Sequence, residues 1–117
     1  MSVVDREKLM ERVGYSCELL LELVELFLDI GPGMFKDIKE SVVKNSAESL
    51  QKSAHALKGS VGNFAAQDTF EACLRLETMG RNKDLTDVSE ALIVLESSLN
   101  KLFDELYAIR NELSARR

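Results

Sequence analysis

Residues 53–64 read SAHALKGSVGNF and contain the only histidine of the 117-residue chain. At helical spacing this stretch has two faces. One face carries His55, with Lys58 about one turn further on and Gly59 and Gly62 beside it. The other face is apolar and extends one turn back; its members are Leu50, Ala54, Leu57, Val61 and Phe64. The spacing predicts an amphipathic helix that buries the apolar face and exposes His55.

Two glycines on an exposed helical face require a reason, because glycine is about 1 kcal/mol less favourable than alanine inside a helix. A face without side chains lets another surface approach closely. We therefore interpret Gly59 and Gly62 as clearance around the imidazole of His55.

The composition is that of an ordinary globular protein rich in helix-forming residues, with 45% hydrophobic and 30% charged residues and one proline. The length predicts one domain over residues 1–117. A net charge of −5 argues against nucleic acid or an anionic membrane as the main partner. No apolar run approaches the roughly 18 residues of a membrane span, and the first residues do not form a signal peptide. We therefore expect a cytoplasmic protein.

Towards the N-terminus the pattern predicts three helices, at residues 5–13, 16–30 and 32–43. The first is too short to be stable alone, so it is expected to cover one end of a bundle, with Ser2 and Asp5 as a possible cap. The apolar stripe of the second continues into the third without a phase change, so we expect a kink at Pro32 between them.

Asn45 and Glu48 fit a capping box for the histidine helix, predicted at residues 47–62. After a turn at 63–66, the next helix is predicted at 67–79 and is expected to end at Gly80. A polar loop follows at residues 81–84.

The last helix has an unbroken seam in which steps of three and four alternate. Its members are Leu85, Val88, Leu92, Leu95, Leu99, Leu102, Leu106, Ile109 and Leu113. Such a seam is typical of a coiled-coil arm or of the longest helix in a left-handed bundle. The other amphipathic helices need a partner, which favours the bundle. We predict an all-α fold, an antiparallel up-down four-helix bundle with a short N-terminal capping helix and a Pro-kinked second helix.

The chain offers little other chemistry. Cys17 and Cys73 are far apart and, with one histidine, make neither a zinc site nor a haem attachment motif. Cys73 lies among apolar residues and is expected in the core. His55 remains as an ordinary surface residue or as a nucleophile whose neutral form is abundant at neutral pH. A neutral imidazole can attack phosphorus, and Lys58 can offer its charge to phosphoryl oxygens.

The run HALKG at residues 55–59, followed by GNF at 62–64, resembles the signature of histidine-containing phosphotransfer (Hpt) domains. The run ACLRLE at 72–77 and the early stretches at 9–14 and 19–29 are also similar to that family. The resemblance covers about residues 5–113. One departure is Ala65, whose position is often glycine in the family.

The resemblance implies a four-helix bundle in which His55 is phosphorylated on its outer ring nitrogen. The phosphoryl group would come from an aspartate of one receiver domain and go to an aspartate of another. The family has no kinase activity of its own and needs no cofactor, because the Mg²⁺ belongs to the receiver. Lys58 would neutralise phosphate charge. Glu77 would hydrogen-bond the inner nitrogen of His55, or it is simply a solvated charge on its helix.

The expected docking surface for response-regulator receiver domains or a hybrid histidine kinase surrounds the histidine. Its residues are Gln51, Lys52, Gly59, Gly62 and Asn63. The lysines at 36, 39 and 44 are more simply read as a solvated face.

Two alternatives stay open. One is the phosphoacceptor domain of a chemotaxis-type histidine kinase, and the other is an interaction module in which His55 is not phosphorylated. The lack of a linker after the last helix favours a stand-alone protein. We expect a monomer, because the seam of the last helix is needed for the core.

Overall fold

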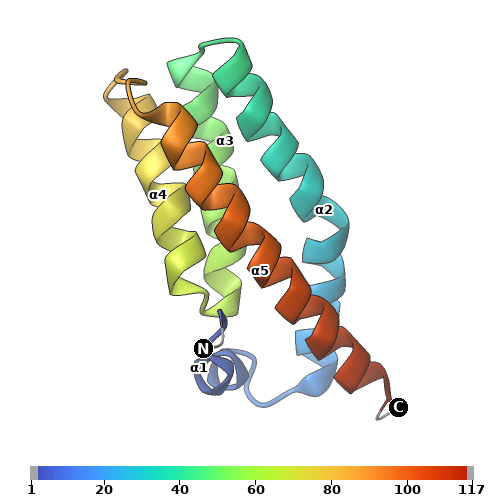
Figure 1. The fold of residues 1–117 in the computed structure, drawn as a ribbon. Helices are drawn as coiled ribbons and strands as arrows, with labels where there is room; N and C mark the ends of the chain where they lie inside the picture. Colours follow the sequence, from blue (N-terminus) through green and yellow to red (C-terminus); the bar gives the residue numbers. More distant parts are fainter. Residues whose placement is uncertain (1–2, 116–117) are drawn as a thin grey trace.

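The computed structural model describes residues 3–115, and this part of the chain is helical without any strand. The possible cap at Ser2 lies outside the described residues. Figure 1 shows the order of the elements. They are α1 (Arg6–Arg12), α2 (Cys17–Val43), α3 (Ala47–Val61), the short 3-10 helix η1 (Gly62–Phe64), α4 (Gln67–Arg81) and α5 (Val88–Ala115). The all-α prediction is confirmed.

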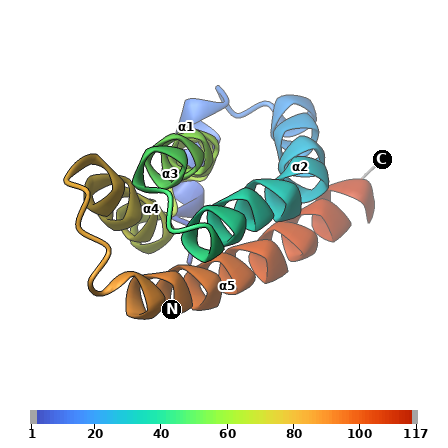
Figure 2. The ribbon, with the colours of Figure 1, turned by 90° about the horizontal axis from the view of Figure 1, so that it is seen from above.

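Each of the four long helices packs on two others. α3 lies between α2 and α4, and α5 packs on α2 and α4 from the other side (Figures 1 and 2). One apolar core fills the space between them. The molecule is elongated, with extents of 47 × 21 × 21 Å, because α2 and α5 are nearly twice as long as α3 and α4.

The first helix covers the end of α3, as predicted for a short helix that cannot stand alone. The backbone N–H of Asp5 donates to the carbonyl of Ala65 at 3.0 Å, and the Arg12 guanidinium donates to the carbonyl of Gly62. Leu9 of α1 is buried. The side chain of Asp5 caps α1 by accepting from the N–H of Lys8.

The second helix is one continuous element, so the prediction of separate helices at 16–30 and 32–43 is wrong. Proline lacks an N–H and its ring crowds the preceding turn. Pro32 is nevertheless exposed, and Gly31 is buried where a Cβ would lie 2.9 Å from the ring of Phe103. Because the apolar positions on both sides of Pro32 face one core, packing favours continuation of the helix.

Two local signals at helix ends differ from the prediction. The cap of α3 is Ser46, whose hydroxyl accepts from the N–H of Ser49, whereas Asn45 takes a left-handed conformation with φ +53°. α4 continues through Gly80 to Arg81. Ala65 has φ +52°, a conformation in which a residue with a Cβ is strained by about 1–2 kcal/mol and glycine is not.

The seam of α5 faces the shared core and does not project from it. Its buried members include Leu95, Leu99, Leu102, Leu106 and Ile109, whereas Leu85, Leu92 and Leu113 are only partly buried. The helix begins at Val88, three residues later than the predicted seam. The heptad pattern thus belongs to packing within the chain.

Candidate functional site

His55 lies on the exposed face of α3, as the sequence predicts. Its neighbours Ala54 and Leu57 are fully buried, whereas the His55 side chain is 68% exposed. Nδ1 of His55 lies 2.9 Å from Oε2 of Glu77 on α4. An ionised carboxylate can only accept, so the proton of a neutral ring is on Nδ1. Nε2 therefore keeps its lone pair.

Glu77 is a buried carboxylate at the contact between α3 and α4, and its side chain is only 4% exposed. Nζ of Lys58 lies 2.7 Å from its Oε1. The guanidinium of Arg81 donates to its Oε2 at 3.1 Å, so Arg81 and His55 share one oxygen. Two cations and the imidazole thus surround a single acid.

The close approach of α3 and α4 brings these groups together. Gly80, one turn after Glu77, packs directly on the α3 backbone: a Cβ there would lie 2.6 Å from the Gln51 nitrogen and 2.7 Å from the Ala47 carbonyl oxygen. The two helices run in opposite directions, so residues near 80 meet residues near 50, and Glu77 meets His55 and Lys58. Gly80, predicted as the end of the helix, is instead a point of close packing between the two helices.

The family model of the Hpt domain matches residues 22–115. The chain belongs to the Hpt domain family. It is therefore a histidine phosphotransfer protein of the phosphorelay type.

The comparison with solved structures shows the same fold. The chain is similar to histidine-containing phosphotransfer protein B (HptB) from Pseudomonas aeruginosa PAO1, with 17% sequence identity and a TM-score of 0.75. The match covers 97% of this chain and 92% of that chain. The comparison with curated proteins finds no match.

Among the expected docking residues of this Hpt domain, exposure is uneven. Lys52, Gly59 and Asn63 are exposed, whereas Gln51 and Gly62 are partly buried. A Cβ on Gly59 would meet nothing within 4 Å, but one on Gly62 would contact the ring of Phe70 at 3.6 Å.

Charges near this surface are mostly engaged or solvated. Lys52 pairs with Glu48 at 3.1 Å. The lysines at 36, 39 and 44 are exposed, as expected for a solvated face, and Lys39 lies over the ring of Phe35.

Cys73 lies behind the site and is buried, as predicted, whereas Cys17 is exposed. Burial raises the pKa of the Cys73 thiol to about 12, and the charge of Glu77 adds to this while that of Lys58 opposes it. The nucleophilic thiolate of Cys73 is therefore not populated at neutral pH.

Residues 3–115 contain no cluster of three or more histidine, cysteine, aspartate or glutamate side chains arranged to hold a metal ion. Within the same residues no helix has the length and apolar character to cross a membrane.

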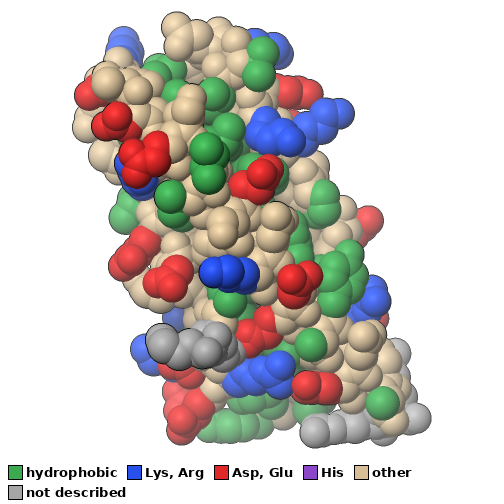
Figure 3. All heavy atoms as spheres, in the orientation of Figure 1, with side chains coloured by type: hydrophobic (Ala, Val, Ile, Leu, Met, Phe, Trp, Pro, Cys, Tyr) green, Lys and Arg blue, Asp and Glu red, His purple; other side chains and the backbone are tan. Residues whose placement is uncertain are grey.

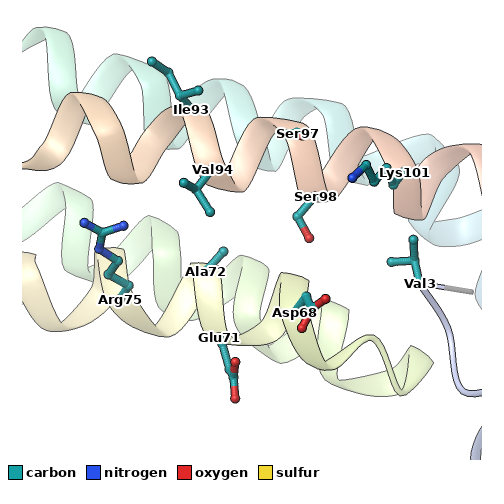
Figure 4. Close-up of a pocket in the computed structure, with 10 residues that line it drawn as sticks. All are labelled: Val3, Asp68, Glu71, Ala72, Arg75, Ile93, Val94, Ser97, Ser98 and Lys101. Atoms are coloured by element: carbon teal, nitrogen blue, oxygen red, sulfur yellow. The ribbon is translucent and has the colours of Figure 1, made fainter. Parts of the chain in front are cut away.

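The face shown in Figure 3 carries mixed acidic and basic side chains, and no histidine is visible on it. On this side an open hollow lies between α4 and α5 (Figure 4). Val94 of α5 points towards Ala72 of α4, with Asp68 and Lys101 further along. None of the groups around Glu77 lines this hollow, so it is separate from the histidine site.

Arg81 is the member of the cluster that the sequence prediction missed. Glu77 and Arg81 are four residues apart, a spacing that joins opposite charges on one helix. The prediction that α4 ends at Gly80 placed Arg81 in a loop, so the pairing of Arg81 with Glu77 was not expected. A helix that continues through Gly80 would have revealed it.

The pKa of Glu77 gives a testable pH dependence. Burial raises it, but the hydrogen bonds and charges of Lys58 and His55 outweigh burial and leave the pKa below its ordinary value of 4.5. When the pKa of a carboxyl group is lower in the folded state, its ionised form stabilises the protein at any pH above the pKa of the unfolded state. This stabilisation is lost as the pH falls through the pKa of the folded state.

We expect Glu77→Gln to lower the free energy of unfolding by about 1.5–3 kcal/mol near neutral pH, the range for hydrogen bonds to charged groups. Glutamine resembles protonated glutamate, so the difference from the unchanged protein should shrink when the pH is lowered from neutral to below 4.5, the ordinary pKa of glutamate. Urea denaturation of both proteins at the two pH values measures this. A difference that stays constant with pH would contradict the assignment of the ionised form to Glu77.

Proposed function

We propose that this chain carries phosphoryl groups on His55, accepting from an aspartate of one receiver domain and donating to an aspartate of another. The observation that supports the proposal is an exposed imidazole whose inner nitrogen lies 2.9 Å from a buried carboxylate, that of Glu77. This arrangement orients the ring and leaves the outer nitrogen facing outward as the nucleophile.

The proposed transfer balances without moving a proton. The Nε2 lone pair of His55 forms the N–P bond while the P–O bond to the receiver aspartate breaks, and that aspartate leaves with the electron pair as a carboxylate. The ring keeps its proton on Nδ1 and becomes positively charged. Glu77, 2.9 Å away, stabilises this charge. The second transfer reverses the same bonds with a new aspartate.

Other residues have supporting roles in the proposal. Lys58 supplies a positive charge to the phosphoryl oxygens. Gly59 and Gly62 leave room for the partner to approach along α3. Together with Gln51, Lys52 and Asn63 they form the docking surface for a receiver domain.

The proposed scaffold is a single Hpt-like domain over residues 1–117. It is an antiparallel up-down four-helix bundle that α1 caps and in which α2 is kinked at Pro32. The mutual packing of α2, α3, α4 and α5 supports it. We infer a cytoplasmic monomer without kinase activity or cofactor of its own, so the Mg²⁺ would be held by the receiver domain.

The test is transfer from a phosphorylated receiver domain to the purified protein. We expect an acid-labile, alkali-stable label on the unchanged protein and none on His55→Gln. Equal labelling of the two proteins, or no labelling of either, would refute the relay. If label appears only when a kinase catalytic domain and ATP are supplied directly, the chemotaxis-type acceptor is the correct function.

A further inference from the structure

Glu77 binds three groups, and they divide between its two oxygens. Oε1 faces Nζ of Lys58 at 2.7 Å. Oε2 accepts from His55 at 2.9 Å and from Arg81 at 3.1 Å. The two cations therefore hold opposite sides of one carboxylate.

In this arrangement Lys58 cannot pair with Glu77 and with a phosphoryl group on His55 at the same time. Its side chain is only 19% exposed and its ammonium is already paired with Glu77. To neutralise a phosphoryl group on Nε2, the ammonium must turn outward and leave Oε1. Loss of one partner from a buried ion pair is strongly unfavourable, because it leaves a buried charge uncompensated. Glu77, at 4% exposure, is such a charge.

We propose that Arg81 is the positioning residue that allows Lys58 to leave Glu77. It remains on Oε2 as the counterion of Glu77, and this frees Lys58 to turn from Oε1 to the phosphoryl oxygens. The inference rests on the phosphoryl transfer to His55 proposed above. It assigns separate tasks to two cations that both contact Glu77 in the unphosphorylated protein.

The charges of the phosphorylated state agree with this division. A phosphoryl group brings about two negative charges. Together with Glu77 these are balanced by Lys58, Arg81 and the positively charged ring of phosphorylated His55. Without Arg81 one negative charge is unbalanced, and Lys58 must serve Glu77 and the phosphoryl group at once.

An ordinary helical salt bridge would not have this effect. Exposed pairs four residues apart contribute little to stability. The guanidinium side of this pair is indeed 53% exposed, but its partner is buried and shares the same oxygen with the reactive histidine. Arg75 provides the matched comparison, because it lies on the same helix and its side chain is 41% exposed. It pairs with Glu90, and not with Glu77, at an N–O distance of 3.7 Å.

The experiment measures the rate of transfer from a phosphorylated receiver domain to the full chain. We expect Arg81→Gln to slow transfer about 10-fold, a typical size for coupled groups, and Arg81→Lys to restore most of the rate. Arg75→Gln should leave the rate unchanged.

The decisive measurement is a double-mutant cycle with Lys58. Lys58→Ala should slow transfer clearly in the unchanged protein and only slightly in the Arg81→Gln background, where Lys58 is already retained by Glu77. Fold-changes that simply multiply would overturn the inference, as would an Arg81→Gln rate equal to that of Arg75→Gln.

Nitrogen-15 NMR of His55 separates this role from a structural one. We expect the proton to stay on Nδ1 in Arg81→Gln, because Lys58 still holds Glu77 in place. Loss of that tautomer would mean that Arg81 merely maintains the site and would overturn the exchange. Absence of any transfer to the unchanged protein would instead refute the relay itself.

Discussion

Replacement of Gly80 by alanine should destabilise the protein by about 3 kcal/mol, at the upper end of the range for overpacking. The added Cβ would lie 2.6 Å from the Gln51 nitrogen and 2.7 Å from the Ala47 carbonyl oxygen. These are backbone atoms of α3, so neither can move aside as a flexible side chain does. The helices must separate, and the gain in helix propensity of about 1 kcal/mol offsets only part of the cost.

Thermal denaturation followed by circular dichroism measures the effect, with an expected fall in Tm of about 10 °C. Gly33→Ala is the matched control, because Gly33 is also helical and a Cβ there meets nothing within 4 Å. It should stabilise the protein by up to about 1 kcal/mol. Equal effects of the two substitutions would show that the contact at Gly80 does not limit the approach of α3 and α4.

Replacement of Glu77 by alanine should slow phosphoryl transfer to His55 by about 100-fold, the penalty typical of a misplaced reacting group. Without the carboxylate, the ring of His55 can rotate and its proton can occupy either nitrogen. The positive charge that develops on the ring also loses the carboxylate 2.9 Å from Nδ1. Both effects reduce the fraction and the reactivity of the productive imidazole.

Rapid-quench measurement of transfer from a phosphorylated receiver domain provides the rate. Glu77→Gln is the conservative comparison, because its amide oxygen can still accept from Nδ1 although it has no charge. We expect its rate to lie between those of the alanine variant and the unchanged protein. An alanine variant that transfers at the original rate would exclude Glu77 from orienting the histidine.

The amphipathic patterns were sufficient to predict which stretches are helical and the face on which His55 lies. They depend on which residues are apolar and how they are spaced, and burial in one core follows directly from both. The ends of the helices were predicted less well. Pro32 and Gly80 are local stop signals, but in each case the helix continues because packing against neighbouring helices outweighs local preference.

The site was predictable only in part for the same reason. His55 and Lys58 share one helix, so their spacing is visible in the sequence. Whether Glu77 on another helix meets them depends on the separation of α3 and α4, which Gly80 determines through its backbone contact. Arg81 was missed because the helix was predicted to end at Gly80, which placed Arg81 outside it.

At one end of the molecule α1 closes the core, outside the residues that match the Hpt family model. The Hpt family model begins at residue 22, whereas α1 spans Arg6–Arg12 and reaches the turn after α3 through Asp5 and Arg12. None of the side chains around Glu77 belongs to α1. We therefore expect substitutions that loosen α1 to lower the thermal stability of the protein while leaving the groups around Glu77 in place.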